Sequence, residues 1–354
     1  MRTTKAVVVV AGIAFGLGLA SVARAECSPE NWKDCEGKPW VIGKAETPIG
    51  ERWWPNKLWG AGDEAGSTNW YTKPEVVLRA LAEADKGKVY QLGRNYESGM
   101  PTFSNRVFEL KMPSKGSGGP AGANAILYRD EIVTSEIGQV GTQFDGIGHI
   151  SVSVNGVQDT NDVRYYNGFK ASEVVTDRGL KKVGVEKMLP IVARGVLLDI
   201  AAAKDVEMLD KGYVITRADV NVALAQQGMA GFEFMPGDGV FFHTGWGKLW
   251  MTDNDKFNSG EPGIGMEVAK WLSDDVQAGV VGADTWGTEA VPGEDPGCVF
   301  CVHSHLLTRH GLVNQEIMYL DELIRDGVYT FTYVYSPMPI LGATGSPGAP
   351  IAID

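Results

Sequence analysis

The chain has 354 residues, of which 44% are hydrophobic and 21% are charged. This composition is too apolar and too weakly charged for a disordered protein, and the length allows a large core. Acidic residues outnumber basic ones by 44 to 32, which gives a formal net charge of −12. An acidic surface repels phosphate backbones and anionic lipids, so the sequence predicts neither nucleic acid nor membrane as partner.

The first 25 residues have the features of a cleavable export signal. Arg2 and Lys5 are basic, residues 6–20 carry no charge, and residues 23–25 form a small-x-small cleavage pattern. An uncleaved membrane anchor is the alternative, but the apolar run is shorter than the roughly 20 residues that span a bilayer. We therefore expect cleavage after Ala25 and a mature protein that is periplasmic or secreted.

Export makes disulfides the expected state of the four cysteines. Cys27 and Cys35 are eight residues apart, and Cys298 and Cys301 form a Cys-x-x-Cys motif just before His303. We take both pairs as structural disulfides, although crossed pairing satisfies the same count. A thiolate metal ligand from Cys298 or Cys301 is a further alternative, which an oxidising compartment disfavours.

Residues 26–354 show no break in composition, charge or repeats, which predicts one α/β domain with an irregular N-terminal arm. This arm, residues 26–72, holds six of the ten tryptophans. We expect these rings to pack the arm onto the body, and the alternative is a pocket wall for a flat aromatic substrate. Sequence patterns then predict, in chain order, a helix over 74–84, a strand over 89–93, a Gly/Ser loop over 113–124, a strand over 196–200, a helix over 218–227, a strand over 240–243, a helix over 265–272, and strands over 279–283 and 328–334.

A polar cluster interrupts this pattern between residues 139 and 149. It contains Gln139, Gln143, Asp145 and His149, with glycines at 138, 141, 146 and 148. If residues 142–145 are extended, Gln143 and Asp145 project to the same side of the chain. The combination favours a polar site, although amides and carboxylates also satisfy turn backbones.

Three of the five histidines, His303, His305 and His310, fall within eight residues. On a helix over 302–311, His303 and His310 share one face, and Gly311 ends the helix. From spacing alone, a half-buried helix with histidines at its edges is the favoured interpretation. The chain contains no P-loop, His-Glu-x-x-His or Gly-x-Ser-x-Gly motif, which argues against the corresponding ATPases, zinc proteases and hydrolases.

The polar cluster resembles the H-x-G-T-H-x-D-x-P-x-H signature of the metal-dependent cyclase family of hydrolases, which includes kynurenine formamidases and isatin hydrolases. The matching positions are Gln139, Gly141, Thr142, Gln143, Asp145, Ile147 and His149. Further blocks similar to the family's lie at 59–69, 87–93, 194–199, 237–246, 282–285 and 342–347. The resemblance implies a mixed β/α swivelling-type fold, a homodimer or homotetramer, and one divalent metal ion that supports hydrolysis of an amide or lactam.

The resemblance also assigns roles to residues. The family's metal ligands fall on Gln139, Gln143, Asp145, His303 and Glu316. The histidine that serves as general acid and base falls on His149, and His305 is a less well matched neighbour of His303. Such a metal polarises the substrate carbonyl and lowers the pKa of a bound water, while His149 takes the water proton and returns it to the leaving nitrogen.

This chain departs from the signature at two ligands, where glutamine replaces histidine. Amide oxygen is a harder donor than imidazole nitrogen, so we expect Mn²⁺ to be favoured over Zn²⁺. The resulting prediction is a metal-dependent hydrolase of a small cyclic or aryl amide, with a formamide, lactam or isatin-like C–N bond. The alternative is a catalytically silent exported protein that binds a small molecule on the same scaffold with a degraded metal site.

Overall fold

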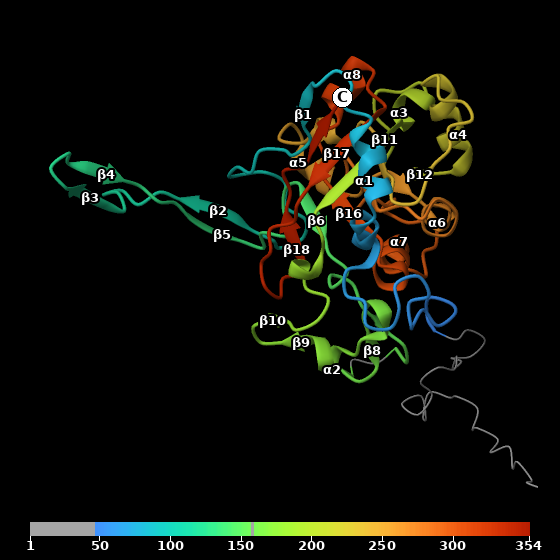
Figure 1. The fold of residues 1–354 in the computed structure, drawn as a ribbon, viewed down its shortest axis with the longest axis horizontal. Coiled ribbons are helices and arrows are strands. Elements are labelled where there is room, and N and C mark those ends of the chain that lie inside the picture. Colours follow the sequence, from blue (N-terminus) through green and yellow to red (C-terminus); the bar gives the residue numbers. More distant parts are fainter. Residues whose placement is uncertain (1–46, 157–158) are drawn as a thin grey trace, which may run out of the picture.

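Residues 47–156 and 159–354 are described in a computed structural model of the protein. Figure 1 shows a rounded body from which one long two-stranded hairpin projects, a segment distinct from the predicted N-terminal arm. None of the helices within these residues is long and apolar enough to cross a membrane. The predicted signal peptide, the predicted pair Cys27 and Cys35, and the first part of the tryptophan-rich segment lie outside the described residues and stay predictions.

The body is built on one nine-stranded sheet of mixed direction. In spatial order its strands are β1 (Val89–Gln91), β19 (Ile351–Ile353), β17 (Thr330–Tyr335), β11 (Ile191–Asp199), β13 (Gly239–His243), β15 (Val280–Ala283), β16 (Val313–Glu316), β6 (Gln143–Asp145) and β18 (Gly345–Pro347). The four strands from β11 to β16 run parallel, and the outer strands are antiparallel to their neighbours. This is the mixed α/β architecture that the sequence predicts.

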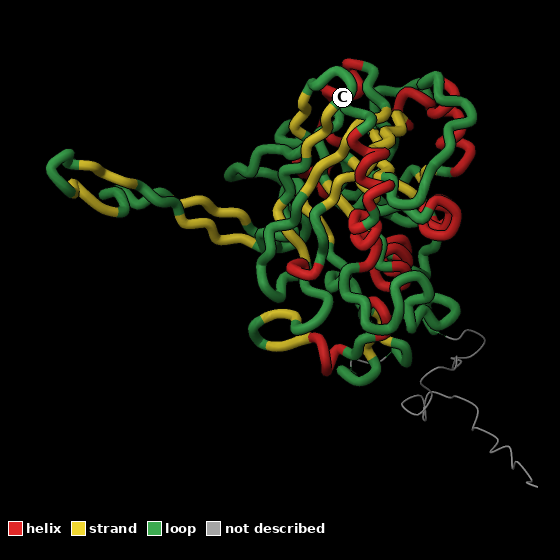
Figure 2. Tube along the Cα trace, in the orientation of Figure 1, coloured by secondary structure: helices red, strands yellow, loops and turns green. Residues whose placement is uncertain are grey.

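Helices are short and lie around the sheet (Figure 2). They are α1 (Pro74–Leu81), α2 (Ala171–Val174), α3 (Ile200–Ala203), α4 (Arg217–Gln226), α5 (Asn254–Asn258), α6 (Met266–Lys270), α7 (Cys301–His303) and α8 (Asp321–Asp326). Tighter 3-10 turns are η2 (Gly66–Thr72), η3 (Tyr166–Gly168), η4 (Val185–Lys187) and η5 (Trp246–Leu249). The wider π-helical turns are η6 (Trp271–Val276), which continues α6, and η7 (Ser304–His310), which continues α7.

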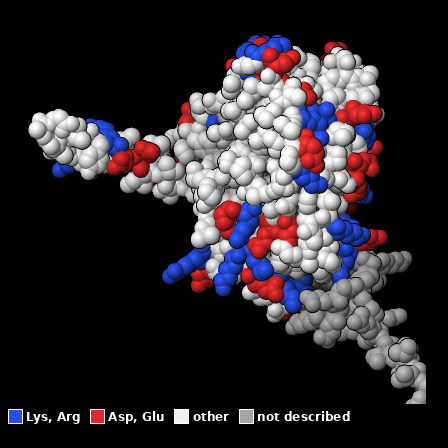
Figure 3. Space-filling view, viewed as in Figure 1, with Lys and Arg blue, Asp and Glu red and all other residues white. Residues whose placement is uncertain are grey.

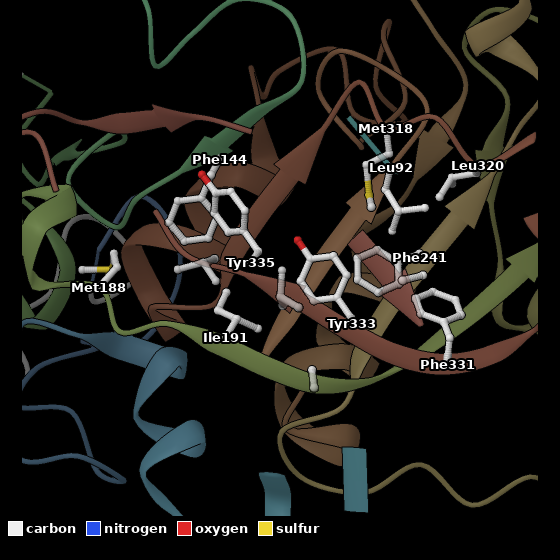
Figure 4. Packing of buried hydrophobic residues seen from close by; sticks show 14 of the residues in the cluster. Leu92, Phe144, Met188, Ile191, Phe241, Met318, Leu320, Phe331, Tyr333 and Tyr335 are labelled. Atoms are coloured by element: carbon white, nitrogen blue, oxygen red, sulfur yellow. The ribbon is translucent and has the colours of Figure 1, made fainter. Parts of the chain in front are cut away.

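The sheet separates two apolar cores because side chains alternate along each strand. In β13, Val240 and Phe242 pack beneath α4, α6 and the α7–η7 helix, while Phe241 points to the other face. That second core is enclosed by the curl of the sheet and contains Phe144 of β6 and Tyr335 of β17, whose ring centroids are 5.2 Å apart (Figure 4). The strand β6, which carries the polar cluster, is thereby anchored from its buried face.

Most predicted elements form close to their predicted ends. The helix predicted at 74–84 is α1, with Pro74 at its first turn, and the helix predicted at 218–227 is α4. The strand predicted at 196–200 begins earlier, at Ile191, because half-buried Arg194 and buried Gly195 interrupt the apolar run without ending the strand. The helix predicted at 265–272 ends its α-helical part at Lys270 and continues as the π-helical turn η6.

The Gly/Ser loop predicted over 113–124 is wrong in part, because residues Gly118–Ala121 form strand β3. This strand pairs with β4 (Ile126–Tyr128), and β2 (Phe108–Lys111) pairs with β5 (Ile132–Ser135) nearer the body. Together they make the projecting hairpin of Figures 1 and 2. Smaller antiparallel pairs are β7 (Val152–Ser153) with β8 (Val163–Arg164), and β9 (Val175–Thr176) with β10 (Gly179–Leu180); β12 (Val214–Ile215) pairs in parallel with β14 (Gly263–Ile264).

Candidate metal centre

Two neighbouring strands bring the halves of the site together. β6 runs antiparallel to β16, with Gln143 opposite Glu316 and Asp145 opposite Asn314. The Gln143 amide donates a hydrogen bond to Glu316 Oε2 at 2.7 Å, and Asn314 donates to Glu316 Oε1 at 2.7 Å. Residues that are 173 positions apart in the sequence therefore meet by strand pairing, and all of these side chains are buried.

The segment before β6 lies against strand β18, and this close contact requires glycine, which has no side chain. A Cβ atom on Gly138 would lie 2.5 Å from the carbonyl carbon of Gly345 in β18, a distance that real Cβ contacts do not show. Glycine at position 138 therefore lets the two backbones touch. This contact places Gln139 so that its amide donates to Asp145 Oδ1 at 3.1 Å.

His303 enters the site from the end of α7. Its Nε2 lies 3.1 Å from Glu316 Oε1 and 3.7 Å from Asp145 Oδ2. Ligating atoms of these three residues all lie within 4.8 Å of one another, and all three side chains are buried. Within the described ranges, this is the one group of three or more histidine, cysteine, aspartate or glutamate residues with that spacing.

Glu289 holds His303 in this orientation, and sequence analysis missed it. The carboxylate accepts backbone N–H bonds from Val302 at 3.2 Å and His303 at 2.9 Å, and its Oε1 lies 2.5 Å from His303 Nδ1. A carboxylate on one imidazole nitrogen directs the other nitrogen, here Nε2, toward a metal. Glu289 follows β15 in an irregular segment, and nothing in the local sequence marks it as a partner of residue 303.

The site fits a cation on the evidence of its unsatisfied oxygens. Asp145 Oδ2 and Gln139 Oε1 are buried and have no hydrogen-bond partner. Buried acceptors without a partner are costly, and a positive ion satisfies them. Asp145, His303 and Glu316 would hold such an ion through two carboxylates and one imidazole, a donor set that divalent metals accept.

The two glutamines lie where the sequence predicts, but they present N–H groups to the carboxylates. Gln139 donates to one oxygen of Asp145 and Gln143 to one oxygen of Glu316. The other oxygen of each carboxylate, Asp145 Oδ2 and Glu316 Oε1, faces His303 Nε2, and Glu316 Oε1 also accepts from Asn314. The glutamines therefore orient the carboxylates in this structure, and their predicted role as direct ligands stays a prediction.

Buried negative charges perturb the acid–base groups of the site. Burial and the neighbouring charge of Asp145 raise the pKa of Glu316. Burial disfavours the imidazolium of His303, but its hydrogen bonds to Glu289 and Glu316 outweigh this effect and raise its pKa. Burial, with the charge of Glu316, also raises the pKa of Glu261, whose Oε1 has no hydrogen-bond partner. The excess of carboxylates calls for added positive charge, as a proton or a metal ion.

His149 follows β6 and is half-buried beside the cluster. Its backbone N–H donates to the Gly146 carbonyl at 2.9 Å, which closes a turn and sets the position of the ring. Burial lowers the pKa of the His149 imidazole, and the nearby charge of Asp145 opposes this shift. A neutral imidazole at the edge of the site is able to accept a proton near neutral pH.

A pocket of about 10 Å³, room for about one water molecule, lies beside the glutamines. Its wall includes Phe103 stacked on Trp286, with ring centroids 4.2 Å apart and planes 15° apart. Arg106 lines the same pocket and donates to the backbone carbonyl of Gln139 at 2.9 Å. The pocket therefore combines a flat aromatic wall with one cation, next to Gln139 and Gln143.

The expectation that His303 and His310 share one helical face is wrong. After Ser304 the helix takes a π-helical form, in which residues five apart are neighbours, so the ring of His310 lies 4.4 Å from that of His305. His303 faces the carboxylates, whereas His310 faces Asp274 on the surface. Gly311 ends the helix in a left-handed conformation, as predicted.

The cysteine pair next to this helix is bonded. Cys298 and Cys301 form a disulfide directly before His303, as the sequence predicts. In this bonded form neither sulfur is free to bind a metal, which disfavours the alternative of a thiolate metal ligand from this pair. Predicted aromatic packing is also present at Trp53 and Trp70, which are both buried.

Comparison with known proteins places this fold and site in a family. The family model described as "Putative cyclase" matches residues 90–290, more than half of the chain, and the protein belongs to this cyclase family. A solved structure titled as a novel cyclase is 29% identical, with a TM-score of 0.69, and the match covers 84% of this chain and 96% of that one.

More distant solved structures share the fold. Isatin hydrolase A from Ralstonia solanacearum has a TM-score of 0.56 at 18% identity, over 79% of this chain and 98% of that one. Isatin hydrolase A from Labrenzia aggregata, bound to benzyl benzoate, has a TM-score of 0.53 at 18% identity, over 78% and 98%. No curated protein matches the chain. The predicted family and fold are confirmed by these comparisons.

Proposed function

We propose that the protein is a metal-dependent hydrolase that cleaves the C–N bond of a small cyclic or aryl amide. The observation that carries this proposal is the buried cluster of Asp145, His303 and Glu316, with Asp145 Oδ2 left without a partner. A bound divalent ion supplies an activated water and polarises the substrate carbonyl. The oxygen-rich donor set supports Mn²⁺ over Zn²⁺.

The chain's own residues divide the remaining work. Glu289 fixes the imidazole of His303, and the two glutamine amides fix which carboxylate oxygens face it. His149, whose pKa is lowered by burial, accepts a proton from the attacking water and returns it to the leaving nitrogen. Such a proton shuttle leaves the imidazole neutral at the end of each cycle.

The residues that line the pocket, and not its volume of about 10 Å³, support an aryl substrate. Phe103 and Trp286 offer a flat surface for stacking, and Arg106 is placed beside it to attract the carboxylate that amide hydrolysis produces. Two of the solved structures with this fold are named as hydrolases of isatin, an aryl lactam. Aryl lactams, whose hydrolysis opens the ring, are therefore the favoured substrate class. The disulfide of Cys298 and Cys301 supports our further proposal of an exported protein, since such bonds persist in oxidising compartments.

The second candidate is a silent protein that binds a small molecule on the same scaffold. The observation that favours it is the orientation of the two glutamine amides, which present N–H groups where the family signature has histidine ligands. This candidate predicts protein that stays folded without metal and hydrolyses no formamide, lactam or isatin-like compound.

Metal content of the purified mature protein separates the candidates. Elemental mass spectrometry without added metal or chelator is expected to find about one equivalent of a divalent ion, lost in Asp145→Ala. Asp255→Ala is the matched control, because Asp255 is an exposed aspartate on α5. His149→Ala is expected to keep the metal and lose turnover of an aryl amide. Protein that takes up neither Mn²⁺ nor Zn²⁺ on incubation would contradict the hydrolase proposal.

A further inference from the structure

The two bonded cysteines enclose a turn that ends where α7 begins. Cys298 and Cys301 have Cα atoms 5.7 Å apart, and Val299 and Phe300 lie between them. Val299 is 82% exposed, whereas His303, two residues beyond the turn, is buried. One side of the turn therefore meets solvent, and the chain that leaves it leads directly into the metal centre.

Phe300 has a backbone conformation that its side chain disfavours. Its φ of 50° and ψ of 52° lie in the left-handed region, which bulky residues rarely adopt. As the residue that caps α7 it accepts the N–H of Ser304 at 3.1 Å, and such cap residues are normally extended. Three extended steps span about 10 Å at roughly 3.3 Å per residue. The bonded cysteines, at 5.7 Å, thus exclude the extended alternative.

The ring of Phe300 connects the metal ligand with the aromatic wall of the pocket. It lies edge to face on the imidazole of His303, with centroids 5.3 Å apart and planes at 71°. It also lies 6.3 Å from the ring of Trp286 and 6.4 Å from that of Phe103, at 76° and 89°. Aromatic pairs favour such edge-to-face arrangements. One side chain therefore contacts both the histidine that would hold the ion and the rings that would hold the substrate.

The hydrogen bonds of Glu289 depend on the same segment. Its carboxylate accepts the backbone N–H groups of Val302 and His303, which follow Cys301 directly, and its Oε1 lies against His303 Nδ1. A shift of the turn therefore moves the start of α7 relative to the carboxylate that fixes the imidazole. Disturbing such a contact behind a ligating histidine lowers metal affinity by about 10- to 100-fold.

A cavity beside the turn gives it room to move. The cavity has a volume of about 270 Å³ and is lined by both cysteines, by Phe300 and by Glu289. Protein interiors normally leave few voids larger than a water molecule. The space allows Phe300 to leave His303 once the cysteines separate, and it offers a small thiol a path to the sulfurs.

The attacking group in thiol–disulfide exchange is a thiolate, which carries a negative charge. Figure 3 shows acidic and basic side chains side by side on the side of the body that carries α6, and α6 packs near α7. The two signs largely offset each other at a distance. An approaching thiolate therefore meets no broad field of like charge on this visible surface.

We propose that the Cys298–Cys301 disulfide is a reversible modification site that controls the metal centre, an inference that rests on the proposed function. While bonded, the pair holds Phe300 against His303, and reduction by a dithiol releases the ring. One thiolate of the dithiol attacks a cysteine sulfur, which breaks the S–S bond and leaves a mixed disulfide and one cysteine thiolate. The second thiol of the reductant then displaces the attacked cysteine. The protein gains two electrons and two protons as two cysteine thiols, and the reductant closes its own disulfide.

Chemical reduction tests this proposal in a protein whose described residues are all unchanged. Cys27→Ser combined with Cys35→Ser leaves Cys298 and Cys301 as the only cysteines, so two thiols per chain report their reduction. Excess dithiothreitol reduces the pair, desalting removes the reagent, and calorimetric titration with Mn²⁺ measures the affinity. Reduced protein is expected to bind Mn²⁺ at least about tenfold more weakly than oxidised protein, and reoxidation is expected to restore the affinity.

Two neighbouring positions inside the turn give a matched comparison. Phe300→Gly removes the ring, and glycine keeps the left-handed conformation without the bond. This variant is therefore expected to bind Mn²⁺ with the same affinity before and after reduction. Val299→Ala changes the exposed neighbour and is expected to keep the full response. Phe300→Tyr retains an aromatic ring and is expected to keep the response as well.

Several outcomes would overturn the inference. They are equal Mn²⁺ affinity of the oxidised and reduced proteins, a pair that yields no thiols to excess dithiothreitol, and a response of Phe300→Gly equal to that of the wild type. Far-ultraviolet circular dichroism checks the fold, and unfolding on reduction also overturns the inference, because the bond then serves stability alone. Near-ultraviolet circular dichroism of metal-free protein follows the aromatic rings, and a change on reduction that Phe300→Gly lacks supports the release of Phe300. Protein that binds no Mn²⁺ in either state contradicts the proposed function instead.

Discussion

Glu289→Gln tests whether a residue that touches no substrate controls the metal centre. The carboxylate accepts three N–H groups, from the backbones of Val302 and His303 and from His303 Nδ1. A glutamine amide has one oxygen, so at least one donor meets an NH₂ group. Loss of one hydrogen bond to a charged group costs about 2 kcal/mol of unfolding free energy. Loss of the carboxylate behind a ligating histidine lowers metal affinity by about 10- to 100-fold, or roughly 1.4 to 2.7 kcal/mol.

Glu294→Gln is the control for this substitution. Glu294 accepts the backbone N–H of Met266 at the start of α6, much as Glu289 does at the start of α7, but it is exposed. Calorimetric titration of metal-free protein with Mn²⁺ gives the affinity, and urea unfolding gives the stability. A folded Glu289→Gln protein that binds Mn²⁺ as tightly as the wild type would refute the positioning role.

Three other perturbations address the ligands, the pocket and the helix. Gln139→His combined with Gln143→His is expected to shift the preference from Mn²⁺ toward Zn²⁺, because imidazole nitrogen suits zinc; competition between the two ions measures it, and an unchanged ratio counts against these positions as ligands. Phe103→Ala removes the ring stacked on Trp286 and is expected to raise KM for an aryl amide about tenfold with little change in kcat; steady-state kinetics on aryl and alkyl amides checks this, and equal losses for both contradict an aromatic wall. Burial lowers the pKa of His305 in the folded protein to about 3, whereas in the unfolded chain it is about 6.5. Between these pH values only the unfolded chain binds the proton, so the free energy of unfolding falls as the pH drops from 6.5 toward 3. At pH 4.5, His305→Gln is expected to remove about 3 kcal/mol of this loss in the free energy of unfolding. If Tm falls with pH equally steeply in the wild type and in His305→Gln, His305 is not the cause.

Local patterns in the sequence were sufficient for several elements of the body, but not for strand β16, which carries Glu316 and was not predicted. The continuous apolar run of β13 and the proline-initiated helix α1 are properties of a few adjacent residues, and both form where predicted. The side-by-side projection of Gln143 and Asp145 also follows from strand geometry alone, and both reach the cluster from β6. Pairing of β6 with β16 is different, because no local pattern indicates which distant strand lies opposite.

The features that sequence patterns missed are those that depend on distant contacts. Glu289 reaches His303 because the segment after β15 passes the start of α7, and that path is set by tertiary packing. β3 is rich in glycine and proline, which carry no strand signal, so its pairing with β4 comes from the hairpin as a whole. The π-helical turn changes the spacing from four to five residues, which moves His310 away from His303 without a mark in the sequence.

The charge balance of the site links metal binding to folding. Asp145, Glu316, Glu289 and Glu261 are buried around a single imidazole, and burial with mutual repulsion raises the pKa of both Glu316 and Glu261. Without an ion, protons offset the repulsion, so the folded state holds protons at a pH at which the unfolded chain has lost them. A divalent ion held by Asp145, His303 and Glu316 would displace protons from these groups, so we expect metal affinity to rise with pH. The glutamines fit this balance, because neutral amides orient Asp145 and Glu316 without adding a charge or a titrating group of their own.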